Sequence, residues 1–238
     1  MTYKDLKITL YADGADIDGM KEEYNKGIVK GFTTNPTLMK KAGVKDYITF
    51  AKAALEAIPD LPISLEVFAD EFDKMEKEAE VLSALSDNVF VKIPITNSKG
   101  ESSIPLIKKL SAKGIKLNVT AIFTVKQVKE TVDAFSMGTE NIVSVFAGRI
   151  MDAGVDAVPV MKEVNEIIKS KPGTKSLWAS CREVYNIVQA DESGTDIVTV
   201  TNDLLKKLPG LGKDLEQFSL ETVQMFVKDG QSLGYSIC

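Results

Sequence analysis

Short β-rich runs that alternate with amphipathic helical stretches constrain the fold of this chain more than any other feature of its sequence. Eight runs rich in Val, Ile and Leu have the length of a buried strand. The stretches between them repeat apolar residues every three or four positions, with charges on the opposite face, as helices that cover a sheet do. Within 238 residues, this alternation predicts an α/β fold: a (β/α)8 TIM barrel that forms one domain over residues 1–238. The predicted strands are Lys7–Asp13, Val29–Asn35, Pro62–Phe68, Val89–Ile95, Lys116–Phe123, Asn141–Gly148, Lys175–Ser180 and Asp196–Thr201.

Helices are expected between these strands and after the last one. Glycine, which readily adopts the left-handed conformation that ends a helix, follows helical stretches at positions 27, 114, 138 and 194. The tail Leu215–Leu233 predicts an extra C-terminal element of one or two helices that packs across the barrel. The other predicted helices are Tyr47–Ile58, Glu71–Leu85, Ile104–Lys113, Val125–Phe135, Ala157–Lys169 and Val184–Glu192.

A doubly wound sheet of six or seven strands is the structural alternative. Such a sheet usually carries a glycine-rich phosphate-binding turn after its first strand. Residues 11–20 read YADGADIDGM, which matches neither the dinucleotide-binding motif nor the P-loop motif. The barrel is therefore the favoured prediction.

Composition excludes several function classes. The chain has no histidine, which excludes Ser-His-Asp and Cys-His catalysis and zinc held by histidine. Its 29 Lys and Arg and 34 Asp and Glu give a net charge of −5 without a basic stripe, so we expect no nucleic-acid or membrane partner. The chain shows no signal peptide and no long apolar run, and its only cysteines are Cys181 and Cys238. These features predict a reduced, cytoplasmic protein.

Polar side chains interrupt strands that should be almost wholly apolar. In the fourth strand, Lys92 shares a face with Phe90 and Pro94, whereas Val91 and Ile93 lie on the other. The apolar face should meet the helices, and the other face should point into the barrel. Polar residues at the carboxyl ends of the strands would then meet at the usual active-site mouth of such a barrel. The residues expected to share one cavity are Asp13, Asn35, Glu66, Lys92, Asn118, Thr120 and Ser144.

Each of these residues also has a purely structural interpretation. A strand lysine can be a snorkelling or edge residue, Asp13 can cap the first helix, and Asn35 fits a turn. Glu66 can be an ion-pair partner, and Thr120 and Ser144 can fill the barrel. Their coincidence at one barrel end favours function instead. A lysine in a desolvated pocket loses part of its proton affinity and can attack a ketone to form an imine, while a carboxylate moves protons.

A second polar cluster follows the sixth and seventh strands. Arg149 follows the sixth strand, and the seventh places Trp178, Ser180 and Arg182 on one side. Two guanidiniums and a hydroxyl at neighbouring strand ends suit a phosphate group. The equally weighted alternative is a pair of surface salt bridges, with partners among Asp152, Asp156 and Glu183.

These motifs resemble the transaldolase family. GFTTNPTLM at residues 31–39 resembles the family motif built around T-T-N-P-S/T-L. The resemblance extends from about Tyr11 to the end of the eighth strand. It implies a TIM-barrel transferase that moves dihydroxyacetone units between sugar phosphates, with a Schiff-base lysine, no cofactor and no metal, and a homo-oligomeric state. The other matching motifs, in the family's order, are YADGADI (11–17), SLEV (64–67), VFVKIPIT (89–96), LNVTAIFT (117–124), VSVFAGRIMD (143–152) and WASCR (178–182).

The resemblance also implies roles for single residues. Lys92 is similar to the imine-forming lysine, and Asp13 to the acid/base that handles the C4 hydroxyl during C3–C4 cleavage. Glu66 and Thr120 resemble the pair that holds a catalytic water. Asn35, Asn118 and Ser144 resemble the groups that hydrogen-bond the dihydroxyacetone moiety, and Arg149, Ser180 and Arg182 resemble the phosphate site. Thr34 and Phe146 are further expected substrate-binding residues.

Two branches of the family differ at positions present here. The fructose-6-phosphate aldolase branch typically has Gln in place of Glu66 and Tyr in place of Phe146. Without a hydroxyl at position 146, the enamine should survive until an acceptor such as erythrose 4-phosphate arrives, which favours transfer over cleavage. Val145, Trp178 and Cys181 depart from the family's usual residues near the anion site. A sulfonated ketose, 6-deoxy-6-sulfofructose, is therefore an alternative to a fructose 6-phosphate-like donor.

Two other function classes stay open at this point. A metal-dependent barrel enzyme would use Asp13 and Glu66 as ligands, which is a thin set without histidine. A catalytically silent barrel would bind a sugar phosphate or serve as an assembly unit.

Overall fold

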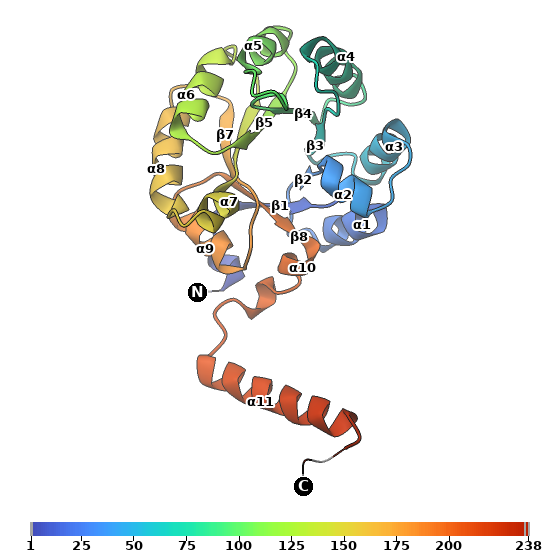
Figure 1. Ribbon diagram of the computed structural model, residues 1–238, viewed down its shortest axis with the longest axis vertical. Helices are drawn as coiled ribbons and strands as arrows, with labels where there is room; N and C mark the ends of the chain where they lie inside the picture. Colours follow the sequence, from blue (N-terminus) through green and yellow to red (C-terminus); the bar gives the residue numbers. More distant parts are fainter. Residues whose placement is uncertain (1, 236, 238) are drawn as a thin grey trace.

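The computed structural model describes residues 2–235 and 237, and a closed barrel of eight parallel strands in sequence order forms its centre (Figure 1). Each strand pairs in parallel with the next, and β8 closes the barrel on β1. The predicted TIM barrel is confirmed. The strands are β1 (Thr9–Asp13), β2 (Phe32–Thr33), β3 (Ile63–Glu66), β4 (Val89–Pro94), β5 (Leu117–Ile122), β6 (Asn141–Val145), β7 (Thr174–Trp178) and β8 (Ile197–Thr201).

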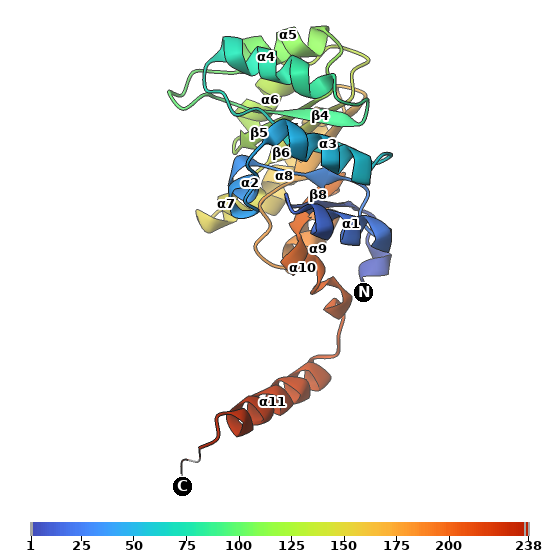
Figure 2. The same cartoon turned by 90° about the vertical axis from the view of Figure 1, so that its right-hand side faces the viewer.

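Helices surround this barrel (Figures 1 and 2). All six helices predicted between strands are present, with ends within two residues of the expected ones. The four glycines predicted after helical stretches have the left-handed backbone; Gly27, with φ of 68°, ends α1. The helices are α1 (Ile17–Lys26), α2 (Pro36–Lys41), α3 (Tyr47–Ala57), α4 (Phe72–Ser83), α5 (Ile104–Ala112), α6 (Val125–Ala134), α7 (Ala147–Asp152), α8 (Ala157–Ile168), α9 (Tyr185–Glu192), α10 (Asn202–Leu205) and α11 (Leu215–Ser232), with 3-10 turns at Tyr3–Asp5 and Leu208–Gly210.

Apolar residues form two clusters, on opposite sides of the strand wall. The larger cluster lies between strands and helices and contains Val91 and Ile93 of β4, whereas Phe90 belongs to the smaller cluster inside the barrel. The alternation of faces predicted for this strand is therefore confirmed, and it places Lys92 inside. The inner cluster consists of Tyr11, Phe90, Ile142, Leu177, Ala179 and Ile197.

Two predicted strands extend three residues beyond the observed strand at one end. The second spans only Phe32–Thr33, because α2 begins at Pro36 with Asn35 as its N-cap. The sixth ends at Val145, and the segment predicted to continue it begins α7. Gly148 in α7 packs so tightly that a Cβ there would lie 1.6 Å from the carbonyl oxygen of Ser180. Gly148, the last residue of the predicted sixth strand, therefore lies in α7 at a close backbone contact.

The C-terminal tail forms a single helix that projects away from the barrel (Figures 1 and 2). The prediction that it packs across the barrel is wrong: no residue of α11 is buried. Gly212, with φ of 82°, lies in the connection and adds a left-handed turn that the pattern of apolar residues does not encode. Across the described part of the chain, none of the helices combines the length and the apolar character that crossing a bilayer requires.

Candidate active site

A cavity of about 410 Å³ lies where the barrel strands end. Most of the polar residues predicted to share one cavity line it, as parallel strands in a barrel require. Thr34, Asn118 and Arg182 do not line it. The predicted site residues that do are Asp13, Asn35, Glu66, Lys92, Thr120, Ser144, Phe146, Arg149 and Ser180.

Lys92 lies in the wall of this cavity and is only 6% exposed. Glu66 is its register partner on β3, so both side chains point to the same side of the wall. The Lys92 Nζ lies 2.9 Å from Oε2 of Glu66 and donates a hydrogen bond of 2.7 Å to the carbonyl oxygen of Thr34. These two contacts aim the amine into the barrel and place a proton acceptor beside it.

Asp13 at the end of β1 is held by a chain of hydroxyls. Thr33 donates its proton to Oδ1 of Asp13 over 2.7 Å. Because a hydroxyl has one proton, Thr199, whose oxygen lies 2.5 Å from that of Thr33, must donate in turn. Burial raises the pKa of Asp13, and the nearby Lys92 ammonium and the Thr33 hydrogen bond only partly oppose this. Asp13 does not cap the first helix, since Asp16 does so.

Thr120 and Ser144 both line the cavity, but their hydroxyls differ in hydrogen bonding. The Thr120 hydroxyl oxygen is buried and has no hydrogen-bond partner among the described residues, so a water or a substrate hydroxyl would satisfy it. Ser144 donates to the amide oxygen of Asn118 over 2.6 Å, and the Asn118 amide donates to Ser64 over 3.0 Å. Asn118 is therefore a buried support beneath the cavity that orients Ser144.

The T-T-N-P motif supports the site through a backbone carbonyl that binds Lys92 and through a side chain that caps α2. Thr34 hydrogen-bonds the carbonyl oxygen of Ser64 through its side chain, and its own carbonyl receives Lys92. Asn35 accepts the backbone N–H of Leu38 and caps α2, while it also lines the cavity. Asn35 therefore serves as the N-cap of α2 and also lies in the wall of the cavity.

The expected anion site is only partly assembled. Arg149 lines the cavity, and its guanidinium lies 5.3 Å from the centre of the Phe146 ring. Arg182 instead binds Asp152, with Nε 2.9 Å from Oδ2, and this half-exposed pair holds the pKa of Asp152 below its usual value. The salt-bridge alternative therefore describes Arg182, whereas Arg149 and Ser180 remain at the cavity.

The seventh strand does not follow the predicted alternation. Trp178 belongs to the outer cluster, and Leu177 and Ala179 face the barrel interior. Ser180 still lines the cavity because its backbone is left-handed, with φ of 66°, which breaks the alternation after the strand ends. Trp178, expected beside the anion site, thus lies on the opposite side of the wall.

Eight residues that line the cavity are not among the predicted site residues: Thr33, Pro36, Thr37, Leu38, Ala121, Leu177, Ala179 and Thr199. Strand parity could have found Thr33, the register partner of Asp13 on β2, and Thr199, the register partner on β8 of Tyr11, which lies two residues before Asp13 on the same face of β1. Ala121 has φ of 58° at a register shift between β5 and β6, which no local pattern announces.

The described residues offer neither a cluster of metal ligands nor a reactive thiol. Within residues 2–235 and 237, no three His, Cys, Asp or Glu side chains are arranged to hold a metal ion. Burial, reinforced by the charge of Asp13, raises the pKa of the Cys181 thiol to about 12, so it is protonated at neutral pH. Cys238 lies outside the described residues.

Known proteins similar in sequence to this chain are named probable transaldolases. The family model described as Transaldolase/Fructose-6-phosphate aldolase matches residues 10–237. A probable transaldolase of Chelativorans sp. (strain BNC1) is 32% identical over 94% of this chain and 99% of its own length. One from Thermoplasma volcanium is 35% identical over 93% of this chain and 98% of its own. A solved structure of KGPDC from Streptococcus mutans superposes with a TM-score of 0.54 at 11% identity, covering 82% of this chain and 88% of that one, and shows the fold alone.

Proposed function

Because this chain belongs to the transaldolase/fructose-6-phosphate aldolase family, a family of transferase-type enzymes, we propose that it transfers a dihydroxyacetone unit from a ketose phosphate to an aldose phosphate. The donor would resemble fructose 6-phosphate and the acceptor erythrose 4-phosphate. One observation carries the proposal: a buried amine, Lys92, faces a 410 Å³ cavity with Glu66 2.9 Å away and Asp13 in the same wall.

Imine formation would be the first step. Glu66 takes a proton from the Lys92 ammonium, and the freed amine attacks the C2 carbonyl carbon of the donor. The C2 oxygen leaves as water after it gains protons, and the unpartnered hydroxyl of Thr120 can hold this water near Glu66. The product is an iminium, which draws electrons away from the neighbouring carbon–carbon bond.

Cleavage would follow at the C3–C4 bond. Asp13 accepts the proton of the C4 hydroxyl, the C4 oxygen forms a carbonyl, and the bond electrons move into the iminium to give an enamine. Glyceraldehyde 3-phosphate leaves. The enamine attacks the acceptor aldehyde, Asp13 returns the proton to the new hydroxyl, and water hydrolyses the imine to free Lys92.

The environment of the enamine supports transfer over simple cleavage. Phe146 offers no hydroxyl to protonate the enamine, and the centre of its ring lies 5.7 Å from that of Phe123.

We expect consumption of fructose 6-phosphate to depend on added erythrose 4-phosphate, with sedoheptulose 7-phosphate formed in equal amount. A coupled assay of both products checks this. Release of free dihydroxyacetone at the same rate without an acceptor would instead establish the aldolase reaction.

Arg149 is proposed to bind the anionic end of the donor. Replacing Arg149 with Met should raise KM for fructose 6-phosphate about tenfold or more, because a charge-assisted hydrogen bond to a phosphate is lost. The same change should affect neutral fructose much less. Arg182→Met is the matched control, since Asp152 holds that guanidinium outside the cavity. An equal rise of KM in both variants would contradict this division of roles.

A sulfonated donor is the second candidate, and one observation favours it. With Arg182 bound to Asp152, Arg149 is the guanidinium that lines the cavity, which suits a group with a single negative charge. Comparing kcat/KM for fructose 6-phosphate and 6-deoxy-6-sulfofructose decides between the donors. The mechanism at Lys92 is the same for both.

A homo-oligomer is the proposed assembly, and α11 supports it. This helix exposes a broad apolar face that includes Phe218, Met225 and Phe226, each at least half exposed, and no described part of its own chain covers it. Exposed apolar side chains that gather on one face usually mark a protein–protein contact. Phe226→Glu should therefore lower the molar mass measured by light scattering in solution. Gln224→Glu, on the polar face, should leave it unchanged; equal masses in all three proteins would contradict the proposal.

A further inference from the structure

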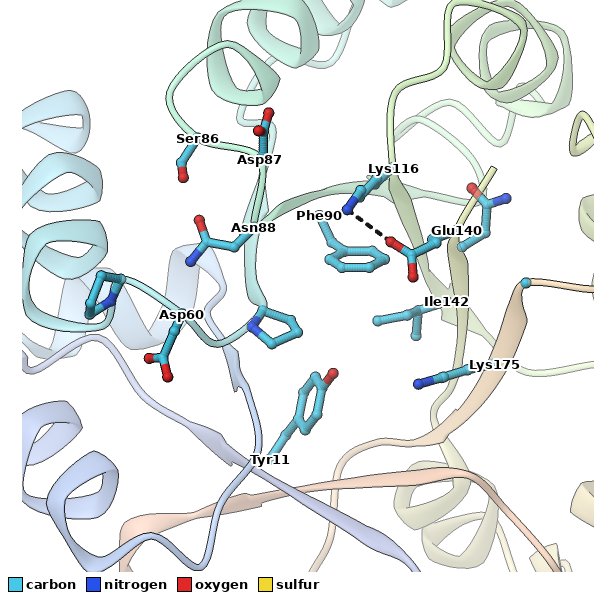
Figure 3. Close-up of a pocket in the computed structure, with 14 residues that line it drawn as sticks. Tyr11, Asp60, Ser86, Asp87, Asn88, Phe90, Lys116, Glu140, Ile142 and Lys175 are labelled. Carbon is cyan, nitrogen blue, oxygen red and sulfur yellow. Dashed lines mark ion pairs between the residues drawn. The ribbon is translucent and has the colours of Figure 1, made fainter. Parts of the chain in front are cut away.

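A second cavity opens at the other end of the barrel, where the strands begin (Figure 3). Its volume of about 520 Å³ falls within the range of pockets that hold small molecules. Three residues of the inner apolar cluster, Tyr11, Phe90 and Ile142, line it. Leu177 of the same cluster lines the active-site cavity instead, so this cluster separates the two cavities.

The Tyr11 side chain is built into this cavity and is only 4% exposed. Its ring occupies the space beside Gly31, where a Cβ would lie 2.4 Å from the ring carbon that carries the hydroxyl. The hydroxyl points toward the centre of the cavity, as Figure 3 shows. Burial, and next the charge of Glu140, raises the pKa of Tyr11 to about 12, so the hydroxyl keeps its proton at neutral pH and remains a donor.

The charges around Tyr11 leave one ammonium without an ion pair. Lys116 and Glu140 bind each other at 2.8 Å, and Asp60 accepts the hydroxyl of Tyr24 at 2.6 Å. Lys175 forms no ion pair within the part of the chain that the structure describes, and its nitrogen points into the cavity (Figure 3). An anion there would meet two donors that lack acceptors.

The apolar residues that line this cavity suit the apolar part of a ligand. Phe90 and Ile142 present a flat ring and a branched side chain to the centre of the cavity, while the carboxylate of Asp87 points away from Lys175 (Figure 3). We propose that this cavity binds a small organic carboxylate with a flat apolar body. Its carboxylate accepts hydrogen bonds from Lys175 and Tyr11, and its body packs on Phe90.

Benzoate is a suitable probe, because it combines one carboxylate with a flat ring. Titration calorimetry of the full-length protein should give saturable binding at one site per chain, and benzyl alcohol, with the same ring but no charge, should not bind. Lys175→Met should abolish the binding, and Tyr11→Phe should weaken it about tenfold, as expected for a lost hydrogen bond to a charge. Lys162→Met removes the same charge from an exposed site on α8 and should change nothing.

Two further outcomes would overturn the proposal. If Arg149→Met abolished binding while Lys175→Met did not, benzoate would occupy the active-site cavity. If the calorimeter detected no saturable binding of benzoate, or if benzyl alcohol bound equally well, the cavity where the strands begin would not recognise carboxylates. Thermal melting of each variant verifies that it is folded, and none of these measurements depends on the transfer reaction.

Discussion

Replacing Lys92 with Met should lower the rate of dihydroxyacetone transfer by at least about 10⁴-fold, because the imine cannot form without the amine. Methionine keeps most of the length and volume of the side chain, so the cavity should keep its shape. Borohydride reduction in the presence of donor should join substrate carbon to the wild-type protein and leave the variant unmodified. Mass spectrometry of peptides that contain residue 92 checks this directly.

The control for this experiment is Lys162→Met, which removes an exposed amine from α8 and should retain full activity and full trapping. The variant at position 92 leaves Glu66 without its cation in a mostly buried place, so we also expect a lower melting temperature. Transfer at the wild-type rate, or a borohydride adduct on a different lysine, would disprove the proposed chemistry.

The barrel and the inward position of Lys92 could be predicted because both follow from alternation along a strand. In β3 and β4, Leu65 and Val91 belong to the outer cluster, while Ser64 is buried on the inner side and Glu66 and Lys92 reach the cavity. Successive side chains of a strand point to opposite faces, so in these two strands the apolar residues meet the helices and the polar ones point into the barrel. This alternation explains why the sequence alone predicts that Lys92 and Glu66 face the barrel interior.

Features outside the strands could not be predicted in the same way. Arg182 turns away from the cavity because it binds Asp152, thirty positions distant in sequence; the sequence favoured this salt bridge no more than a phosphate contact. Ser180 reaches the cavity through a left-handed backbone that non-glycine residues seldom adopt. The apolar pattern predicted α11 as a helix, but it contains no information about whether the partner of that helix belongs to the same chain.

Replacing Asp13 with Asn should slow transfer by about 10²- to 10⁴-fold, the contribution expected of a general acid–base group. Imine formation precedes the step assigned to Asp13, so borohydride should still trap donor on Lys92 in this variant. Loss of trapping together with loss of transfer would instead assign Asp13 to imine formation. Asparagine has nearly the same size and shape as aspartate and can still accept the Thr33 hydrogen bond through its amide oxygen, so the cavity should keep its shape.

The pH dependence of the rate provides a separate test of Asp13. The ionised form must accept the C4 proton, so kcat for cleavage should rise with pH through the raised pKa of Asp13. Thr33→Val removes the hydrogen bond that lowers this pKa and should move the rise to higher pH. A profile that is the same in both proteins would show that another group accepts the proton.

The raised pKa of Asp13 also predicts that Asp13→Asn, which should slow the reaction, stabilises the folded protein at neutral pH. Below the usual Asp pKa of 3.8, the carboxyl is protonated in both the folded and the unfolded chain, and Asp13→Asn should leave the free energy of unfolding almost unchanged. Above 3.8, the unfolded chain releases the proton first, so the wild type loses stability until the pH passes the raised pKa. The variant has no such loss and should be the more stable protein at neutral pH. Urea unfolding well below the usual Asp pKa and again at neutral pH measures the difference. A wild type that is the more stable protein at neutral pH would show that Asp13 is stabilised as the ion and would contradict the raised pKa.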